Sequence, residues 1–187
     1  MRIDHIAFRT KDRKGAEDFF IKALGYKIAK KYPNGFHIDF EDGTFVDCTV
    51  LEPGTKSDIA GLPWIMNLPI YNSNQETEYH LPPEIFISQG SAGSIVDDWV
   101  NENGNGLHHI ALLVDSVEET KKQWDSLGYI EFSGDPTVCP GLTQIFTKPS
   151  SITGFIYELI EREKGEDGFC NKNVKNLMQS TKINKKF

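Results

Sequence analysis

The sequence has no excess of positive charge, since 20 lysine and arginine residues stand against 27 aspartate and glutamate residues and the formal net charge is −7. Nucleic acids and anionic membrane surfaces favour clustered positive charge, so neither is expected as a partner. The sequence also lacks an apolar run of membrane-spanning length and a basic, then apolar, leader. These absences predict a cytoplasmic protein whose partner is a small molecule.

Cysteine is scarce as well. The three residues Cys48, Cys139 and Cys170 are widely separated and odd in number. They do not form the Cys-x-x-Cys pattern that is typical of zinc and redox sites. The sequence therefore predicts three reduced thiols.

What the sequence does contain is an internal repeat. The tripeptide His-Ile-Ala occurs at 5–7 and 109–111, and Leu-Gly-Tyr occurs at 24–26 and 127–129. Between these anchors, apolar residues at three- and four-residue steps predict a helix in each copy. Strand-like runs separated by turn residues follow each Leu-Gly-Tyr. Each copy is therefore predicted to fold as β-α-β-β-β.

The predicted fold is α+β: two βαβββ modules form a cup-shaped mixed sheet within one domain, 1–163. A stretch rich in proline, serine and asparagine interrupts the repeat and is predicted to carry one short helix near 94–100. Apolar residues at helical spacing predict a further short amphipathic helix near the C-terminus. The expected divisions are module one at 1–53, an insertion at 54–104, module two at 105–163, and a C-terminal lid helix and tail at 164–187.

The alternation of side chains along a strand separates two adjacent histidines. His5 and His109 occupy equivalent positions of the repeat, opposite the apolar face that suits packing under the helices. We expect both to point into the concave side of the sheet. His108 is expected on the helix side, as a capping or edge residue.

A third candidate ligand lies in the last strand-like run, where Glu158 shares a face with Ile156 and Ile160. Burying an unpaired carboxylate is costly, and a metal ion would remove that cost. Two histidines and one carboxylate with open coordination positions are typical of non-haem Fe(II) sites, although Mn, Co, Ni or Zn can occupy them. The sequence predicts one divalent ion, with Fe(II) favoured.

These features resemble the vicinal-oxygen-chelate superfamily, which includes glyoxalase I, methylmalonyl-CoA epimerase, extradiol dioxygenases and 4-hydroxyphenylpyruvate dioxygenase. The segments NGNGLHHIAL, LTQIFTKP, IYELIERE and GFCNKNVKNLMQS are similar to the catalytic C-terminal half of the last of these. The resemblance implies a metal held by His5, His109 and Glu158. It also places Gln144 on a catalytic glutamine that lines the pocket, and the tail from Gly168 on the helix that closes the site.

The resemblance implies a non-haem Fe(II) dioxygenase that acts on a small 2-oxo acid or a related chelating substrate, and family members of this size lead us to expect a homodimer. Two departures from the family stand out. Residues 54–89 show no similarity to it, and Cys170 and Lys172 interrupt a glycine-rich stretch of its tail. The substrate therefore stays open.

The alternative is a metal-dependent isomerase or lyase of the epimerase or glyoxalase type. Those enzymes take a fourth ligand from the last strand of the first module, here GTFVDCTVLEP, where Asp47 or Thr49 is the candidate. Threonine is a poor ligand for a divalent metal and aspartate a good one. We favour three ligands. A non-enzymatic binding protein of the bleomycin-resistance type is the second alternative.

Overall fold

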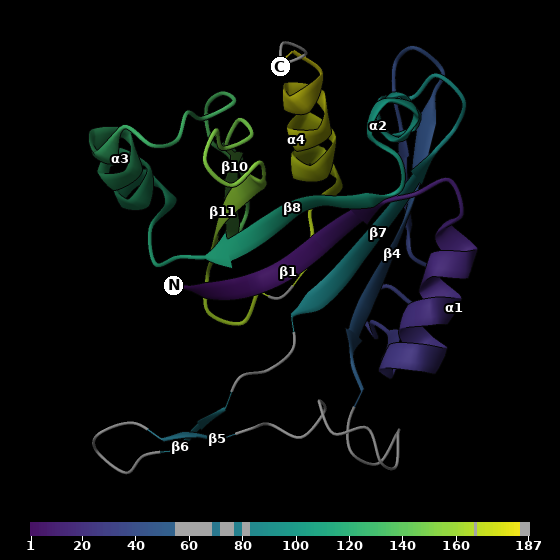
Figure 1. The fold of residues 1–187 in the computed structure, drawn as a ribbon, viewed down its shortest axis with the longest axis horizontal. Helices are drawn as coiled ribbons and strands as arrows, with labels where there is room; N and C mark the ends of the chain where they lie inside the picture. Colours follow the sequence, from purple (N-terminus) through teal and green to yellow (C-terminus); the bar gives the residue numbers. More distant parts are fainter. Residues whose placement is uncertain (55–68, 72–76, 80–82, 167, 184–187) are drawn as a thin grey trace.

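The computed structural model describes residues 1–54, 69–71, 77–79, 83–166 and 168–183. Four helices and eleven strands are found in these residues (Figure 1). The elements in chain order are β1 Arg2–Arg9, α1 Arg13–Leu24, β2 Tyr26–Ile28, β3 Phe36–Asp39, β4 Phe45–Pro53, β5 Pro69–Tyr71, β6 Thr77–Tyr79, β7 Glu84–Gly90, α2 Ile95–Asn103, β8 Gly106–Leu113, α3 Val117–Leu127, β9 Thr137–Cys139, β10 Leu142–Phe146, β11 Ile156–Arg162 and α4 Asn171–Ile183. No helix among the described residues is both long and apolar enough to cross a membrane.

Nine strands form one mixed sheet in the order β2-β4-β7-β1-β8-β11-β10-β9, with β3 paired to β4 beside this path. The first strands of the two repeats, β1 and β8, are antiparallel neighbours in the middle of the sheet. Each pairs in parallel on its other side, β1 with β7 and β8 with β11. The predicted α+β class with a mixed sheet is confirmed.

The register between β1 and β8 expresses the sequence repeat. Ile6 lies opposite Ile110, its own counterpart at a shift of 104 positions. A pseudo-twofold axis therefore passes between these two residues and relates the modules. Each repeat helix ends as predicted at a Leu-Gly-Tyr glycine, Gly25 with φ 75° and Gly128 with φ 71°. Glycine adopts this left-handed conformation without the steric cost of a Cβ.

The segment 54–104, expected to be an insertion outside the repeat, contains a central strand instead. β7 pairs with β4 on one side and with β1 on the other, so it serves as the last strand of the first repeat. Its residues 85–88 are all buried, because both faces of the strand are covered. A strand buried on both faces lacks the alternating pattern on which the sequence prediction relied. The short helix expected near 94–100 is α2, capped by Ser94.

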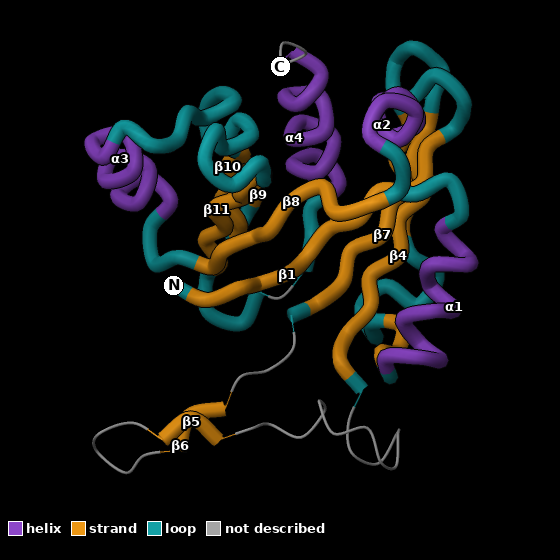
Figure 2. The backbone as a smooth tube through the Cα atoms, in the orientation of Figure 1, coloured by secondary structure: helices purple, strands orange, loops and turns teal. Residues whose placement is uncertain are grey.

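Helices cover both faces of the sheet (Figure 2). Ile87 of β7 packs with α1, whereas its neighbour Phe86 packs with residues of α2 and α4. Because successive side chains of a strand point to opposite faces, α1 lies on one face and α2 with α4 on the other. Leu159 of β11 likewise packs with α3, on the opposite face from Glu158 and Ile160. The inward face, under α2 and α4, is the one that carries the site.

The expectation of three reduced thiols is wrong for two of them. Cys139, at the end of β9, forms a disulfide with Cys170, directly before α4. Their Cα atoms lie 6.6 Å apart although 31 positions separate them in the chain. Only the fold brings these two residues together, so spacing in the sequence gave no sign of the pair. Cys48 is a free, buried thiol, as predicted.

Candidate metal centre

Three neighbouring strands bring the three predicted ligands together. His5 comes from β1, His109 from β8 and Glu158 from β11, and all three side chains are buried. The two histidine Nε2 atoms lie 3.3 Å apart, and they lie 3.2 Å and 3.1 Å from Glu158 Oε2. Among the described residues, this is the one group of three or more histidine, cysteine or carboxylate side chains close enough to share an ion.

The donor set fits a divalent cation. Histidine nitrogen and carboxylate oxygen atoms bind such ions at about 2.1 Å, and three atoms with the mutual distances found here can all contact one ion at that length. Burial makes the fit more favourable, because an ion would neutralise a carboxylate that has little access to water. The cluster is therefore a candidate metal site, and the binding of an ion there stays a prediction.

Two symmetric bulges aim the ligand histidines. The β1–β8 register shifts between Ile3 and Ile6 and again between Ala7 and Phe8, which leaves Asp4 and His108 as repeat-equivalent residues next to a ligand. A bulge suspends the strict alternation of side chains. Asp4 Oδ2 lies 2.9 Å from His5 Nδ1, and His108 Nδ1 lies 2.8 Å from His109 Nδ1. Both histidines thus have Nδ1 engaged by a neighbouring residue and Nε2 directed towards Glu158.

The prediction for His108 is therefore wrong. The side chain is 4% exposed, and it lines the same cavity as His5 and His109 rather than the edge of the sheet. The bulge at this position, which strand alternation cannot reveal, turns it inward. Asp4 was missed for the same reason, and Arg162 Nε and Nη2 fix its carboxylate from 3.1 Å and 3.0 Å.

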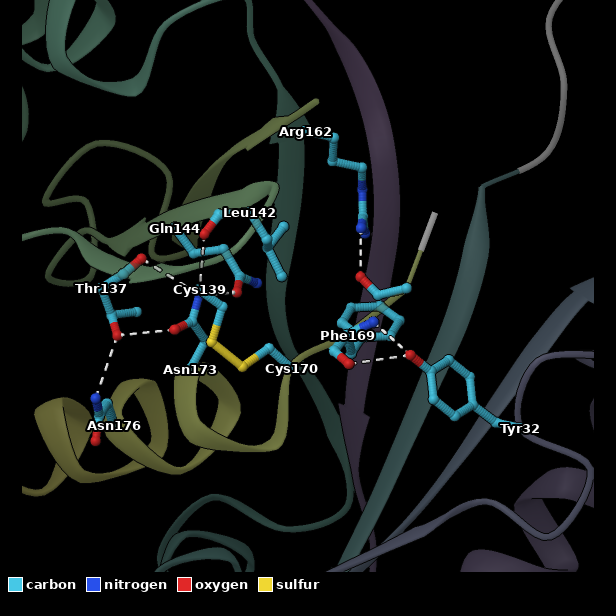
Figure 3. Close-up of a disulfide and its surroundings, with 11 residues drawn as sticks. Tyr32, Thr137, Cys139, Leu142, Gln144, Arg162, Phe169, Cys170, Asn173 and Asn176 are labelled. Carbon is cyan, nitrogen blue, oxygen red and sulfur yellow. Dashed lines mark hydrogen bonds between the residues drawn. A yellow bond between two sulfur atoms is a disulfide. The ribbon is translucent and has the colours of Figure 1, made fainter. Parts of the chain in front are cut away.

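A chain of amide contacts runs from α4 to the carboxylate ligand, and Figure 3 shows its first link, between Asn173 and Gln144. Asn173 Nδ2 donates to Gln144 Oε1 at 3.0 Å, and Gln144 Nε2 donates to Glu158 Oε1 at 2.6 Å. All three side chains are buried. Glu158 Oε1 is thereby occupied, and Oε2 is left facing the histidines. Gln144 lies beside the metal cluster as expected, but its contacts indicate that it positions Glu158; Asn173 was not found from sequence.

The three side chains shift one another's pKa. Burial alone would lower the pKa of His5, but the nearby Glu158 and Asp4 carboxylates outweigh it and raise the pKa to about 9. Burial would raise the pKa of Glu158, but the two histidines lower it to about 2. The pKa of His109 is lowered, mainly by burial. At neutral pH these shifts favour a protonated His5 beside an ionised Glu158.

The cavity at this cluster has a volume of about 30 Å³. Phe86 and Phe146 contribute apolar walls, and Val174, Leu177 and Met178 of α4 contribute an apolar cover. A cavity of this size holds one or two water molecules. A larger substrate needs more space than this cavity offers, and the role of α4 as a lid stays a prediction.

Neither candidate for a fourth ligand reaches the cavity. Asp47 Oδ1 lies 2.7 Å from His37 Nδ1 at the surface. Thr49 is buried, but its hydroxyl donates to Glu17 at 3.2 Å outside the cavity lining. Because β7 and not β4 is the last strand of the first repeat, both candidates were sought on the wrong strand.

The true counterpart of Glu158 follows from strand register. His5 pairs with Glu84 and its repeat partner His109 pairs with Ile156, so Glu84 and Ile156 are equivalent. Two residues further along each strand, Glu158 corresponds to Phe86. A phenylalanine cannot bind a metal ion through its ring in this setting. The cluster therefore offers three protein ligands, with no fourth from this position.

Comparisons with known proteins agree with this fold. The glyoxalase/bleomycin resistance protein/dioxygenase superfamily model matches residues 4–146. A mutant of 4-hydroxymandelate synthase from Streptomyces coelicolor shares 16% identity with a TM-score of 0.68; the alignment covers 99% of this chain and 54% of the synthase. No curated protein matches the chain.

Shorter solved proteins are similar over nearly their whole length. A hypothetical protein of Bacillus halodurans shares 21% identity with a TM-score of 0.58, over 89% of this chain and 98% of that one. A methylmalonyl-CoA epimerase from Mycobacterium tuberculosis shares 14% identity with a TM-score of 0.55, over 87% and 88%. At these identities the similarity establishes the fold alone. Together with the match over 4–146, it shows that the chain belongs to the glyoxalase/bleomycin resistance protein/dioxygenase superfamily.

Proposed function

We propose that this protein is a non-haem Fe(II) dioxygenase that acts on a small 2-oxo acid or a related chelating substrate. The observation that carries the proposal is the ligand count: His5, His109 and Glu158 converge, while Phe86 occupies the position where a fourth ligand would stand. Three protein ligands leave room for two substrate oxygens and for dioxygen, whereas four leave too few positions.

When bound, the iron would supply a chelation point for the 2-oxo acid and the redox chemistry that uses dioxygen. The chain's own residues supply the setting. Asp4 orients the His5 ring, and Gln144 holds one oxygen of Glu158 so that the other faces the histidines. Such outer contacts commonly fix the ligands of a metal site. The apolar cover from α4 excludes water from the reacting groups.

The epimerase-like alternative rests on length, since solved epimerases match this chain almost end to end. An isomerase of that type would use a redox-inactive metal and a base that removes a proton next to a polarised carbonyl. The described residues offer no fourth ligand on β7 at the Glu158-equivalent position, which favours the dioxygenase.

The test begins with the metal content of protein purified without chelator and with oxygen consumption by the Fe(II)-loaded protein over a panel of 2-oxo acids. We expect oxygen uptake that depends on a 2-oxo acid. Glu158→Gln should weaken metal binding by roughly 100-fold or more, because it removes the charge of a ligand. Asp47→Asn, the matched control, should leave metal affinity unchanged, since Asp47 pairs with His37 at the surface.

Two results would contradict the proposal. Metal loss in Asp47→Asn would mean that a fourth ligand had been overlooked. Anaerobic turnover of an acyl thioester by the Co(II)-loaded protein, without oxygen uptake on any 2-oxo acid, would assign the protein to the isomerase or lyase class.

A further inference from the structure

A second functional group lines the metal cavity, and the metal site does not use it. Arg9 lies at the end of β1, four residues beyond His5, and is 3% exposed. Its guanidinium lies 5.6 Å from the ring centroid of Trp99. Among the described residues, no carboxylate forms an ion pair or a hydrogen bond with Arg9.

An unpaired buried cation is unfavourable. Removing a guanidinium from water costs free energy that proteins normally recover with a carboxylate or another anion. A cation–π contact with one ring recovers part of it. Burial lowers the pKa of Arg9 to about 9, so the group still carries its charge at neutral pH. An anion inside the cavity would remove this cost.

The fold itself does not require an arginine here. At the repeat shift of 104 positions, the counterpart of Arg9 is Leu113 on β8, which packs against an apolar cluster. The equivalent position of the second module thus accepts an apolar side chain. Arg9 therefore needs an explanation beyond folding.

His108 provides a second hydrogen-bonding group in the same cavity. Its Nε2 atom is buried and has no hydrogen-bond partner among the described residues. If His109 binds a metal through Nε2, its Nδ1 carries the proton and donates to His108 Nδ1 at 2.8 Å. His108 Nδ1 is then an acceptor, and the proton of this neutral ring resides on Nε2. Metal binding thereby makes His108 Nε2 a hydrogen-bond donor.

We propose that Arg9 and His108 form an anion subsite that binds a carboxylate at the end of the substrate remote from the metal. The substrate class is then a 2-oxo dicarboxylic acid, chelated at one end and paired with Arg9 at the other; this part rests on the proposed function. Arg9 lines the same cavity as the two ligand histidines, and His108 of the subsite lies directly beside His109, so a short carbon chain suits the space between the two ends. Its entry requires the α4 cover to retreat, as for any substrate of this site.

The test compares two acids that differ only at the remote end, 2-oxoglutarate and 2-oxopentanoate. Their binding to Zn(II)-loaded protein is measured by calorimetry, so that no turnover intervenes. We expect 2-oxoglutarate to bind at least about tenfold more tightly to the wild type, as a buried charge-assisted pair provides. Arg9→Met should abolish this preference while 2-oxopentanoate binding and zinc content stay the same.

Lys11→Met is the matched control. It also removes one positive charge near the end of β1, but Lys11 pairs with Asp97 at the surface and does not line the cavity. It should keep the full preference. We expect Arg9→Met to melt at the same temperature as the wild type or higher, since a buried unpaired charge is removed; if it fails to fold, Arg9→Gln replaces it. Equal binding of the two acids by the wild type, or a preference that survives loss of Arg9, overturns the proposal.

Failure of the proposed function gives a different result. If neither 2-oxo acid binds to the zinc-loaded protein, the chelating substrate is excluded, and propionate then tests the anion subsite by itself on the same zinc-loaded protein. A propionate-dependent rise in melting temperature in the wild type and Lys11→Met, but not in Arg9→Met, supports the subsite. No difference between the three proteins under propionate overturns it.

Discussion

The two modules share a fold and one histidine each, but their equivalent inward positions differ in chemistry. Module two places a carboxylate, Glu158, where module one has Phe86. Module one instead places Arg9 where module two has Leu113. The duplicated architecture thus brings together three candidate metal ligands from both modules, while the remaining equivalent positions differ between the modules. The repeat thus predicts which positions face the cavity, and the residues that differ between equivalent positions indicate the function of each module.

Restoring symmetry at the carboxylate position should have the largest effect. Phe86→Glu gives module one the ligand that module two has, so the site gains a fourth protein ligand. Oxygen consumption on 2-oxo acids should fall by roughly tenfold or more, because an open position is lost. The metal should also raise the melting temperature by more than it does in the wild type, since it neutralises an additional buried carboxylate.

Phe86→Leu controls for loss of the ring at the same position. It should keep the wild-type metal dependence of melting and most of the oxygen consumption. If Phe86→Glu behaves like Phe86→Leu in both measurements, the assignment of Phe86 as the counterpart of Glu158 is wrong.

A smaller effect is expected from removing a contact that supports Glu158, a support that module one lacks. Asn173→Ala removes the donor to Gln144, which then holds Glu158 less firmly. Metal affinity should fall by up to about tenfold, the lower end of the usual cost of losing an outer contact, because Asn173 acts on Glu158 only through Gln144. Titration with a competing chelator measures this directly.

Asn176→Ala is the matched control on the same helix. Asn176 also contacts Thr137, but not Gln144. Its metal affinity should equal that of the wild type. Equal losses in the two variants would mean that both act through the packing of α4 and not through the amide chain.

The smallest expected effect concerns the reactivity of the cysteines, since module one has a free thiol and module two has a disulfide-bonded cysteine. Cys48 of module one is buried, and burial raises its thiol pKa far above the usual range, so it should resist alkylation in the native protein. Mass spectrometry should show no modified thiol in the native state, one after denaturation, and three after denaturation with reduction. Two additional labelled thiols without reductant would exclude the Cys139–Cys170 bond.

Much of the site could be predicted from sequence because short continuous segments carry the repeat. The His-Ile-Ala and Leu-Gly-Tyr anchors located the central strands and the helix ends, and the apolar neighbours of Glu158 indicated its inward face. Strand alternation, a local rule, was enough for these residues.

The rest depends on relations between distant segments. The bulges that turn Asp4 and His108 inward are features of the β1–β8 register, which a single strand does not encode. β7 lacked alternation because both of its faces are buried. Asn173 reaches Gln144 from a helix 29 positions away, and Cys170 reaches Cys139 across 31. Local periodicity carries no information on such pairs.

The segment directly before α4 is attached to the rest of the fold by hydrogen bonds and a disulfide (Figure 3). Arg162 donates a hydrogen bond to the carbonyl of Gly168. Tyr32 forms hydrogen bonds with the backbone of Phe169. Cys170 forms the disulfide with Cys139. In the expected lid motion, a helix anchored at its first turn would pivot there, and its displacement would grow along its length of about 20 Å. Leu177 and Met178 would then move further than Asn173. Such an opening would break the contact between Ser180 and Ser133 and leave the amide contacts to Glu158 in place.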